Sequence, residues 1–293
     1  MKVCYLILAH NNFVHLDRLI NALDDNNSTF YIHIDKKAIG QFKSDKQNVT
    51  IIPQHKSINW GGYAMVEATL ALLQHGMAHN SDADYFILLS GVDYPIRSKD
   101  FLYNQLDRGK EFIDCAPTPF SDKPMGRFEY YYFDVDRRKY GYFHPKIVVE
   151  IAMRLFKIKR KIPFKIYVGG QWFALTRECV KYILDVIKTD KQYESFFSNS
   201  LIADEAFIQT IIANSPFAGN IVPNMTYTDW TGPNPPIKIE KRHVDFFKNN
   251  IVLEDEYGTR YPCFARKFDD NSTAVINEIE KVLRQKSDLK TFE

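Results

Sequence analysis

The chain has 293 residues, of which 45% are hydrophobic and 25% are charged, and its formal net charge is +2. These values are typical of a globular protein with one large α/β domain or two small ones, and the near-neutral charge argues against a nucleic-acid-binding protein. The four cysteines form no CxxC pair, and no apolar stretch approaches the roughly 18 residues of a membrane span. We therefore expect buried free thiols and a cytoplasmic protein that is at most peripheral to a membrane.

The first predicted elements form a βαβ unit. Residues 3–8 are a continuous apolar run, as expected of a strand buried on both faces, and the segment FYIHID at 30–35 reads as a second strand. Between them, apolar residues recur with helical spacing at 16, 19, 20 and 23. Further strands are expected at 49–52, 85–89, 112–115 and 172–175, and helices at 65–77 and 180–187. This alternation predicts an α/β fold with a mostly parallel sheet.

Residues that follow the strands are the first candidates for a site, because open α/β sheets bind ligands at the carboxyl ends of their strands. They are His10, Asp35, Asp93 and the Gly169–Gly170 pair. The sequence contains neither GxGxxG after the first strand nor GxxxxGK[ST], which argues against a dinucleotide enzyme and against a P-loop NTPase.

Asp35 and the pair Arg266 and Lys267 are candidates for nucleotide binding. A carboxylate at a strand end can accept hydrogen bonds from ribose hydroxyls, although Asp35 could equally cap its strand or pair with a neighbouring lysine. The two cations in FARKFDD could neutralise a diphosphate leaving group, or could be a solvated basic pair on a surface strand.

Asp204 and Glu205 are candidates for acid–base catalysis. The segment LIADEAFIQTIIANS predicts a helix with both carboxylates in its first turn. The helix dipole alone can explain acidic residues there, and it would lower a carboxylate pKa, whereas a general base usually needs a raised one. Pattern alone therefore favours the structural interpretation.

Two further features have competing interpretations. Asp134 and Asp136 form a DxD that could hold a divalent cation, but Arg137 and Arg138 follow directly and could pair with them. The stretch from Met153 to Lys165 carries six cations among apolar residues. It could contact an anionic membrane or a lipid-diphosphate acceptor, or form a solvated helix face and loop.

Together these segments resemble the core-2/I-branching glycosyltransferase family (glycosyltransferase family 14), which includes β-1,6-N-acetylglucosaminyltransferases and peptide O-xylosyltransferases. The likeness follows the chain in order through YLILAHNN, LDRLINAL, YIHIDKKA, NWGGYAMVEATLALL, FILLSGVDYPIRS, GGQWFALTREC, ADEAFIQTIIANSPF, YTDW and FARKFD. It implies a GT-A-like fold and an inverting mechanism that needs no metal ion, with no cofactor beyond the UDP-sugar co-substrate. It also argues against Asp134 and Asp136 as metal ligands.

The resemblance assigns roles to residues. Glu205 matches the family's catalytic base, and Lys267, with Arg266 beside it, matches the basic motif that neutralises the diphosphate. A second diphosphate-binding arginine of the family could match Arg242 or Arg260. The nucleoside would contact Leu8, Ala9 and Asp35, whereas Asp93, Trp172, Asp204, Tyr227 and Trp230 would lie near the donor sugar or the acceptor.

The resemblance also guides the wider expectations. Eukaryotic members carry a Golgi anchor, a stem and disulfides, none of which this sequence displays, so we expect a bacterial-type cytoplasmic catalytic domain. We expect a single domain over 1–293, with donor binding mainly in 1–115 and acceptor binding and catalysis mainly in 116–293. The expected donor is UDP-N-acetylglucosamine or UDP-xylose, and the expected acceptor is a glycan or lipid-linked glycan. The alternatives are a metal-dependent GT-A transferase that uses Asp134 and Asp136, a sugar-nucleotide hydrolase, and a non-catalytic carbohydrate-binding protein.

Overall fold

The computed structural model describes residues 1–293 except 81, 142–143, 233–235 and 285–293. Its centre is a seven-stranded sheet in the order β10-β6-β9-β4-β1-β2-β3, in which the only antiparallel pairs are the two made by β9. The predicted mostly parallel α/β fold, consistent with a GT-A-like fold, is therefore confirmed. The strands are β1 (Val3–Ala9), β2 (Ser28–Ile34), β3 (Val49–Ile51), β4 (Tyr85–Ser90), β6 (Glu111–Ile113), β9 (Phe173–Thr176) and β10 (Ile221–Val222).

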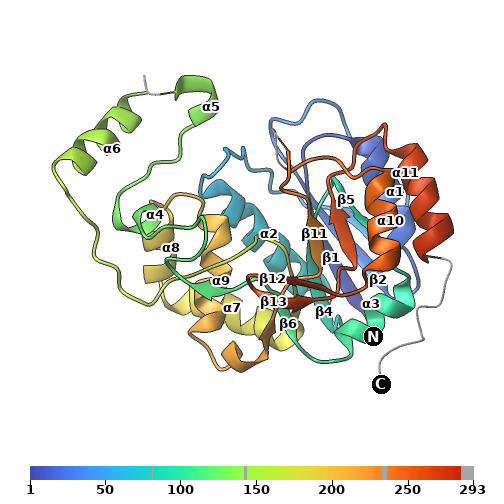
Figure 1. Cartoon of the computed structure of the whole chain (residues 1–293). Coiled ribbons are helices and arrows are strands. Elements are labelled where there is room, and N and C mark those ends of the chain that lie inside the picture. The colour runs from blue at the N-terminus through green and yellow to red at the C-terminus, as the bar shows by residue number, and fades with distance from the viewer. Residues whose placement is uncertain (81, 142–143, 233–235, 285–293) are drawn as a thin grey trace.

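Helices cover both faces of this sheet (Figure 1). Successive side chains of β1 point to opposite faces, so Val3, Tyr5 and Ile7 enter one hydrophobic core while Cys4 and Leu6 enter the other. The first core is closed by α1 (Phe13–Leu23), α3 (Lys99–Leu106), α10 (Lys241–Asn249) and α11 (Thr273–Ile279). The second is closed by α2 (Ala64–His79), α7 (Arg177–Thr189), α8 (Gln192–Phe197) and α9 (Phe207–Ala213).

The strand order reverses at β1, which pairs with β2 on one side and with β4 on the other. Ligands bind at such a switch point, outside the carboxyl ends of the strands. A small sheet lies beside this edge, because β5 (Asp93–Pro95) follows β4 closely and pairs with β14 (Phe264–Arg266), which in turn pairs with β11 (Thr226–Thr228). Residues near the end of the chain are thereby brought to the end of β4.

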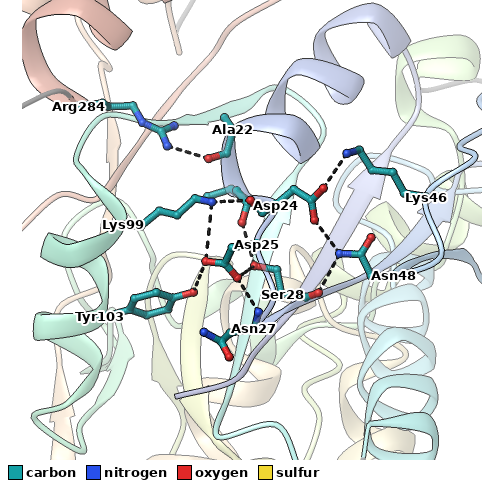
Figure 2. Close-up of polar contacts among 11 residues, drawn as sticks. Ala22, Asp24, Asp25, Asn27, Ser28, Lys46, Asn48, Lys99, Tyr103 and Arg284 are labelled. Carbon is teal, nitrogen blue, oxygen red and sulfur yellow. Dashed lines mark hydrogen bonds and ion pairs between the residues drawn. The ribbon is translucent and has the colours of Figure 1, made fainter.

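A polar network lies at the opposite end of the sheet, beside the amino end of β2 (Figure 2). The carboxylate of Asp24 accepts hydrogen bonds from Lys46 and Asn48, and that of Asp25 accepts one from Tyr103 at 2.7 Å. Lys99 donates to the backbone carbonyl of Asp24. The loop after α1 is thus tied to α3 and to the residues just before β3. This network lies at the end of the sheet that is remote from the candidate site.

The segment between β6 and β9 makes a long excursion from the central sheet, although Phe128 of this segment packs in the second core. It contains β7 (Ala116–Pro117), α4 (Gly126–Glu129), α5 (Arg137–Tyr140), α6 (Pro145–Leu155) and β8 (Tyr167–Val168). In Figure 1, α5 and α6 lie at the upper left, apart from the central sheet. A two-stranded sheet of β12 (Leu253–Asp255) and β13 (Gly258–Arg260) completes the elements used below. Among the described helices, none is both long enough and apolar enough to cross a membrane.

Candidate active site

The carboxyl ends of β1 and β2 gather four of the candidate polar residues. The amide of Asp35 donates to the carbonyl of Ala9 at 2.8 Å, so the two strand ends stay together. Burial lowers the pKa of His10, which also senses the charges of Asp35, Lys267 and Arg266. Residues from three distant parts of the sequence therefore share one electrostatic environment beside the last residues of β1, including Leu8.

Asp35 also acts as a turn residue. Its Oδ1 accepts a hydrogen bond from the amide of Lys37 at 2.8 Å, which is the strand-end cap considered in the sequence. The turn uses one carboxylate oxygen and fixes the direction of the side chain. A carboxylate held in this way is suited to accept from ligand hydroxyls.

Arg266 is held from two sides. Its Nε lies 3.4 Å from Oδ1 of Asp93, and its guanidinium carbon lies 4.2 Å from the centre of the Trp172 ring. Asp93 is fully buried, and this burial raises its pKa to about 6 while the charge of Arg266 opposes the shift. Neither atom of this ion pair has a hydrogen-bond partner among the described residues. The guanidinium is thus oriented by a carboxylate and an aromatic face, a setting suited to an anionic ligand.

Glu205 lies on a short 3₁₀ turn, Ala203–Glu205, that precedes α9. Its Oε2 lies 2.9 Å from Nη1 of Arg127, which α4 supplies and which is itself largely buried. Arg127 was not predicted, because 78 residues separate the partners and no local pattern connects them. The structure therefore presents the candidate base as one partner of an ion pair.

The prediction that Asp204 and Glu205 begin an α-helix was wrong. Ile202 has φ 53°, and Ala206 separates the 3₁₀ turn from α9 with φ −143°. The carbonyl of Glu205 accepts from the amide of Gly169 rather than from a residue farther along α9. The argument from the dipole of α9 consequently does not apply to these two carboxylates.

Asp204 has a strongly shifted pKa. Its Oδ1 is buried and has no hydrogen-bond partner among the described residues. Burial raises the pKa of Asp204 to about 7, and the charge of Glu205 adds to the increase. Strongly shifted carboxylates of this kind concentrate at functional sites.

The Gly169–Gly170 pair joins the Glu205 turn to the residues around Arg266. Gly169 donates to the carbonyl of Glu205 at 2.9 Å, and Trp172 follows two residues after Gly170. A Cβ at position 169 would lie 1.7 Å from the carbonyl oxygen of Asp114, so only glycine fits this approach. The glycine at position 169 is therefore required for a steric reason.

The remaining candidates lie in different surroundings. The ring of Tyr227 packs against α10, 5.0 Å from the ring of Phe247, whereas Trp230 is 65% exposed. Arg260 is buried, with Nη1 donating to Asn224 and Nη2 3.2 Å from Asp114. Arg242 is exposed and lies 3.5 Å from a carboxylate oxygen of Asp229.

The DxD residues have protein partners. Oδ1 of Asp134 accepts from the side-chain Nδ2 of Asn59 at 2.8 Å, and Oδ2 of Asp136 lies 3.7 Å from Nζ of Lys37. Within the described part of the chain, no group of three or more His, Cys, Asp and Glu side chains is arranged to hold a metal ion. Asp136 therefore contacts the loop that follows Asp35, and Asp134 contacts the segment between β3 and α2.

Known proteins are similar to this chain over most of its length. The sequence profile of the family described as "Branch: Core-2/I-Branching enzyme" matches residues 3–252. Xylosyltransferase 2 of Canis lupus familiaris is 27% identical over 305 aligned residues, which cover 95% of this chain and 33% of that protein. Xylosyltransferase 2 of Mus musculus is also 27% identical, and xylosyltransferase 1 of Canis lupus familiaris is 26% identical over 302 residues, or 30% of its length.

The chain therefore spans about a third of the length of these curated relatives. The profile match covers most of this chain and includes the strand ends, the Gly169–Gly170 segment and the Glu205 turn, and it confirms the family resemblance inferred from the motifs. The chain belongs to the Core-2/I-Branching enzyme family of glycosyltransferases.

Proposed function

We propose that this protein transfers a sugar from a UDP-sugar to an acceptor hydroxyl, with inversion at the anomeric carbon and without a metal ion. The observation that carries the proposal is the convergence of Arg266 and Lys267 with His10 and Asp35 at the ends of β1 and β2. Two cations beside the carboxyl ends of parallel strands are suited to a nucleoside diphosphate.

The donor site draws on both halves of the chain. Leu8, Ala9 and Asp35 would contact the nucleoside, and Arg266 and Lys267 would neutralise the diphosphate. Asp93 and Trp172 act as positioning residues, because they hold the guanidinium of Arg266 at 3.4 Å and 4.2 Å respectively. A guanidinium held in place before the reaction loses little entropy when the charge on the leaving group develops.

Glu205 is the proposed general base. The acceptor oxygen attacks the anomeric carbon, its proton passes to the Glu205 carboxylate, and the bond from that carbon to the diphosphate oxygen breaks. UDP departs with the electron pair, and its charge is met by the two cations. Attack from the face opposite UDP inverts the anomeric centre. Arg127 orients the base through its contact with Oε2, and Asp204 lies beside it.

The proposed substrates are supported by the relatives and by the family. The named relatives are xylosyltransferases, which supports UDP-xylose as a donor, and UDP-N-acetylglucosamine is the other candidate. We propose a cytoplasmic protein that acts on a glycan or lipid-linked glycan, with Tyr227 and Trp230 toward the acceptor. Peripheral contact with the inner face of a membrane would involve residues 154–165.

Product stereochemistry tests this proposal. Purified protein would be incubated in EDTA with each α-linked UDP-sugar and a panel of nitrophenyl glycosides, and proton NMR would follow UDP release and the new anomeric signal. A β-linked product supports direct inversion. An α-linked product, or transfer that requires added Mn²⁺, would contradict the proposed mechanism, and free sugar alone would indicate a hydrolase.

A further inference from the structure

Ile147 and Glu150 are the buried residues of α6 and mark the side of this helix that faces the protein. Glu150 is buried, and its carboxylate accepts from the amide of Phe133 and from Nη2 of Arg137, both at 2.6 Å. One turn later, Arg154 hydrogen-bonds to the Tyr132 hydroxyl and places its guanidinium over that ring. The side of α6 that carries Glu150 and Arg154 is therefore the side fastened to the rest of the chain.

The apolar side of α6 points outward. Val148, Val149, Leu155 and Phe156 are 53%, 45%, 76% and 80% exposed. Their spacing of i, i+1, i+7 and i+8 places them on one face of the helix, opposite the face that contains Glu150. Figure 1 shows α6 at the margin of the molecule, away from both hydrophobic cores. A continuous apolar face turned toward solvent indicates a surface that binds something apolar.

The chain around this face is strongly cationic. Residues 144–165 contain seven lysine and arginine residues and a single acidic residue, Glu150, which is already paired with Arg137. After α6 ends, Lys157 is exposed directly after the exposed Leu155 and Phe156, and Lys161 is exposed four residues farther along the chain. An apolar ridge bordered by lysines is complementary to an anionic bilayer surface, where acyl chains lie just beneath negative headgroups.

We propose that the outward face of α6, with the lysines that follow it, docks the protein on an anionic phospholipid bilayer. The apolar side chains enter the boundary between headgroups and acyl chains, and the lysines contact lipid phosphates. The principal contact is the apolar face of α6, whereas the basic stretch at 154–165 would supply only electrostatic attraction. It does not depend on the transfer reaction for its binding energy.

The docking surface is connected to the candidate base. The carbonyl of Arg127 accepts from the amide of Leu201 at 3.1 Å, and Arg160 Nη1 donates to the carbonyl of Asn199 at 2.8 Å. These contacts tie the segment that carries α6 to the residues that lead into the Glu205 turn. If the proposed function is correct, docking also brings that turn close to acceptors embedded in the bilayer.

Vesicle flotation tests the apolar contact. Purified protein would be mixed with vesicles of phosphatidylcholine alone or of phosphatidylcholine with 30% phosphatidylglycerol, and the floated fraction would be measured. We expect binding to the anionic vesicles and about tenfold or greater weakening in Leu155→Ser/Phe156→Ser. The matched control Val14→Ser/Val252→Ser, which changes exposed apolar residues elsewhere, should bind as the wild type does.

A second pair of variants tests the charge. Lys157→Gln/Lys161→Gln should weaken binding by about fivefold for each lysine, and added salt should weaken the wild type in parallel. Lys188→Gln/Lys248→Gln removes exposed lysines elsewhere and should have little effect. Unchanged melting temperatures would show that the variants fold.

Three outcomes would overturn the proposal. They are no flotation with anionic vesicles, equal flotation of wild type and the Leu155→Ser/Phe156→Ser variant, and a wild-type dimer that becomes monomeric in that variant. The last result would assign the face to a second copy of the chain. Transfer to a soluble acceptor should be the same in wild type and variant, so failure of docking and failure of the proposed reaction are distinguishable.

Discussion

Arg127 Nη1 lies 2.9 Å from Oε2 of Glu205, so a residue of α4, between β6 and β9, directly contacts the candidate general base. The pair is largely shielded from solvent, with side-chain exposures of 12% and 29%. A carboxylate in this position cannot rotate freely. The contact therefore gives the proposed base a defined orientation before any substrate binds.

Replacement of Glu205 tests its role as the base. Glu205→Gln keeps the shape of the side chain but removes the proton acceptor, so we expect turnover to fall by about 10²-fold or more while UDP affinity stays nearly unchanged. Glu194→Gln, which alters a partly exposed carboxylate paired with Lys191, is a suitable control. Turnover close to that of the wild type would remove Glu205 from the catalytic role.

Lys267 should matter for donor binding. Lys267→Ala removes a cation from the proposed diphosphate site, and we expect UDP binding to weaken by about 1.5–3 kcal/mol, the range of a charge-assisted hydrogen bond. Isothermal titration with UDP measures this change, and Lys181→Ala on α7 controls for loss of surface charge. Equal UDP affinity in wild type and Lys267→Ala would place the diphosphate elsewhere.

Asp204 should make stability depend on pH. Its pKa in the folded protein is about 7, above the ordinary value of 3.8 that it regains on unfolding. Its contribution to stability is therefore fully present below pH 3.8 and is lost as pH rises through 7. Asp204→Asn should gain stability relative to the wild type by up to about 1.4 kcal/mol for each pH unit across this window.

Urea unfolding at pH 5 and pH 8 measures this effect of Asp204. Asp185→Asn, a change at an exposed carboxylate, should show a difference from wild type that is nearly independent of pH. If the Asp204→Asn difference were also independent of pH, the buried carboxylate would not have the raised pKa described above.

Gly169 should tolerate no side chain. In Gly169→Ala the new Cβ would meet the Asp114 carbonyl, and the backbone would have to move, so we expect a loss of about 1–3 kcal/mol or more in the free energy of unfolding. Gly219→Ala is the matched control, because a Cβ there would have no heavy atom within 4 Å. Equal stability of the two variants would refute the close approach between Gly169 and Asp114.

The sequence predicted the parts of the site that depend on strand ends. The apolar run at 3–8 and the helical spacing after it identified β1 and α1, and this βαβ unit was enough to place His10 and Asp35 at one edge. Arg266 could be named from its motif, but its ion pair with Asp93 depends on the register of β14 against β5, which no local pattern specifies.

Other features depend on contacts between distant segments. The 3₁₀ turn at Glu205 was missed because the apolar periodicity at 207–212 gives no sign that the helix begins only after Ala206. The turn depends on the backbone of Ile202 and on the contact with Gly169. In the sequence, the outward apolar face of α6 shows the same helical periodicity as a buried helix face would. Only the positions of Glu150 and Arg154 against their partners reveal which side of the helix faces solvent.

The most direct test of the central claim is thermal stabilisation of the purified protein by UDP, UDP-xylose and UDP-N-acetylglucosamine in the presence of EDTA. We predict a clear increase in melting temperature with UDP and with at least one UDP-sugar that persists in EDTA and is reduced in Lys267→Ala, because a ligand that binds only the folded state stabilises it. A shift that appears only with Mn²⁺ would restore Asp134 and Asp136 as candidate metal ligands. The absence of a shift with any of these nucleotides would contradict the proposed UDP-sugar site.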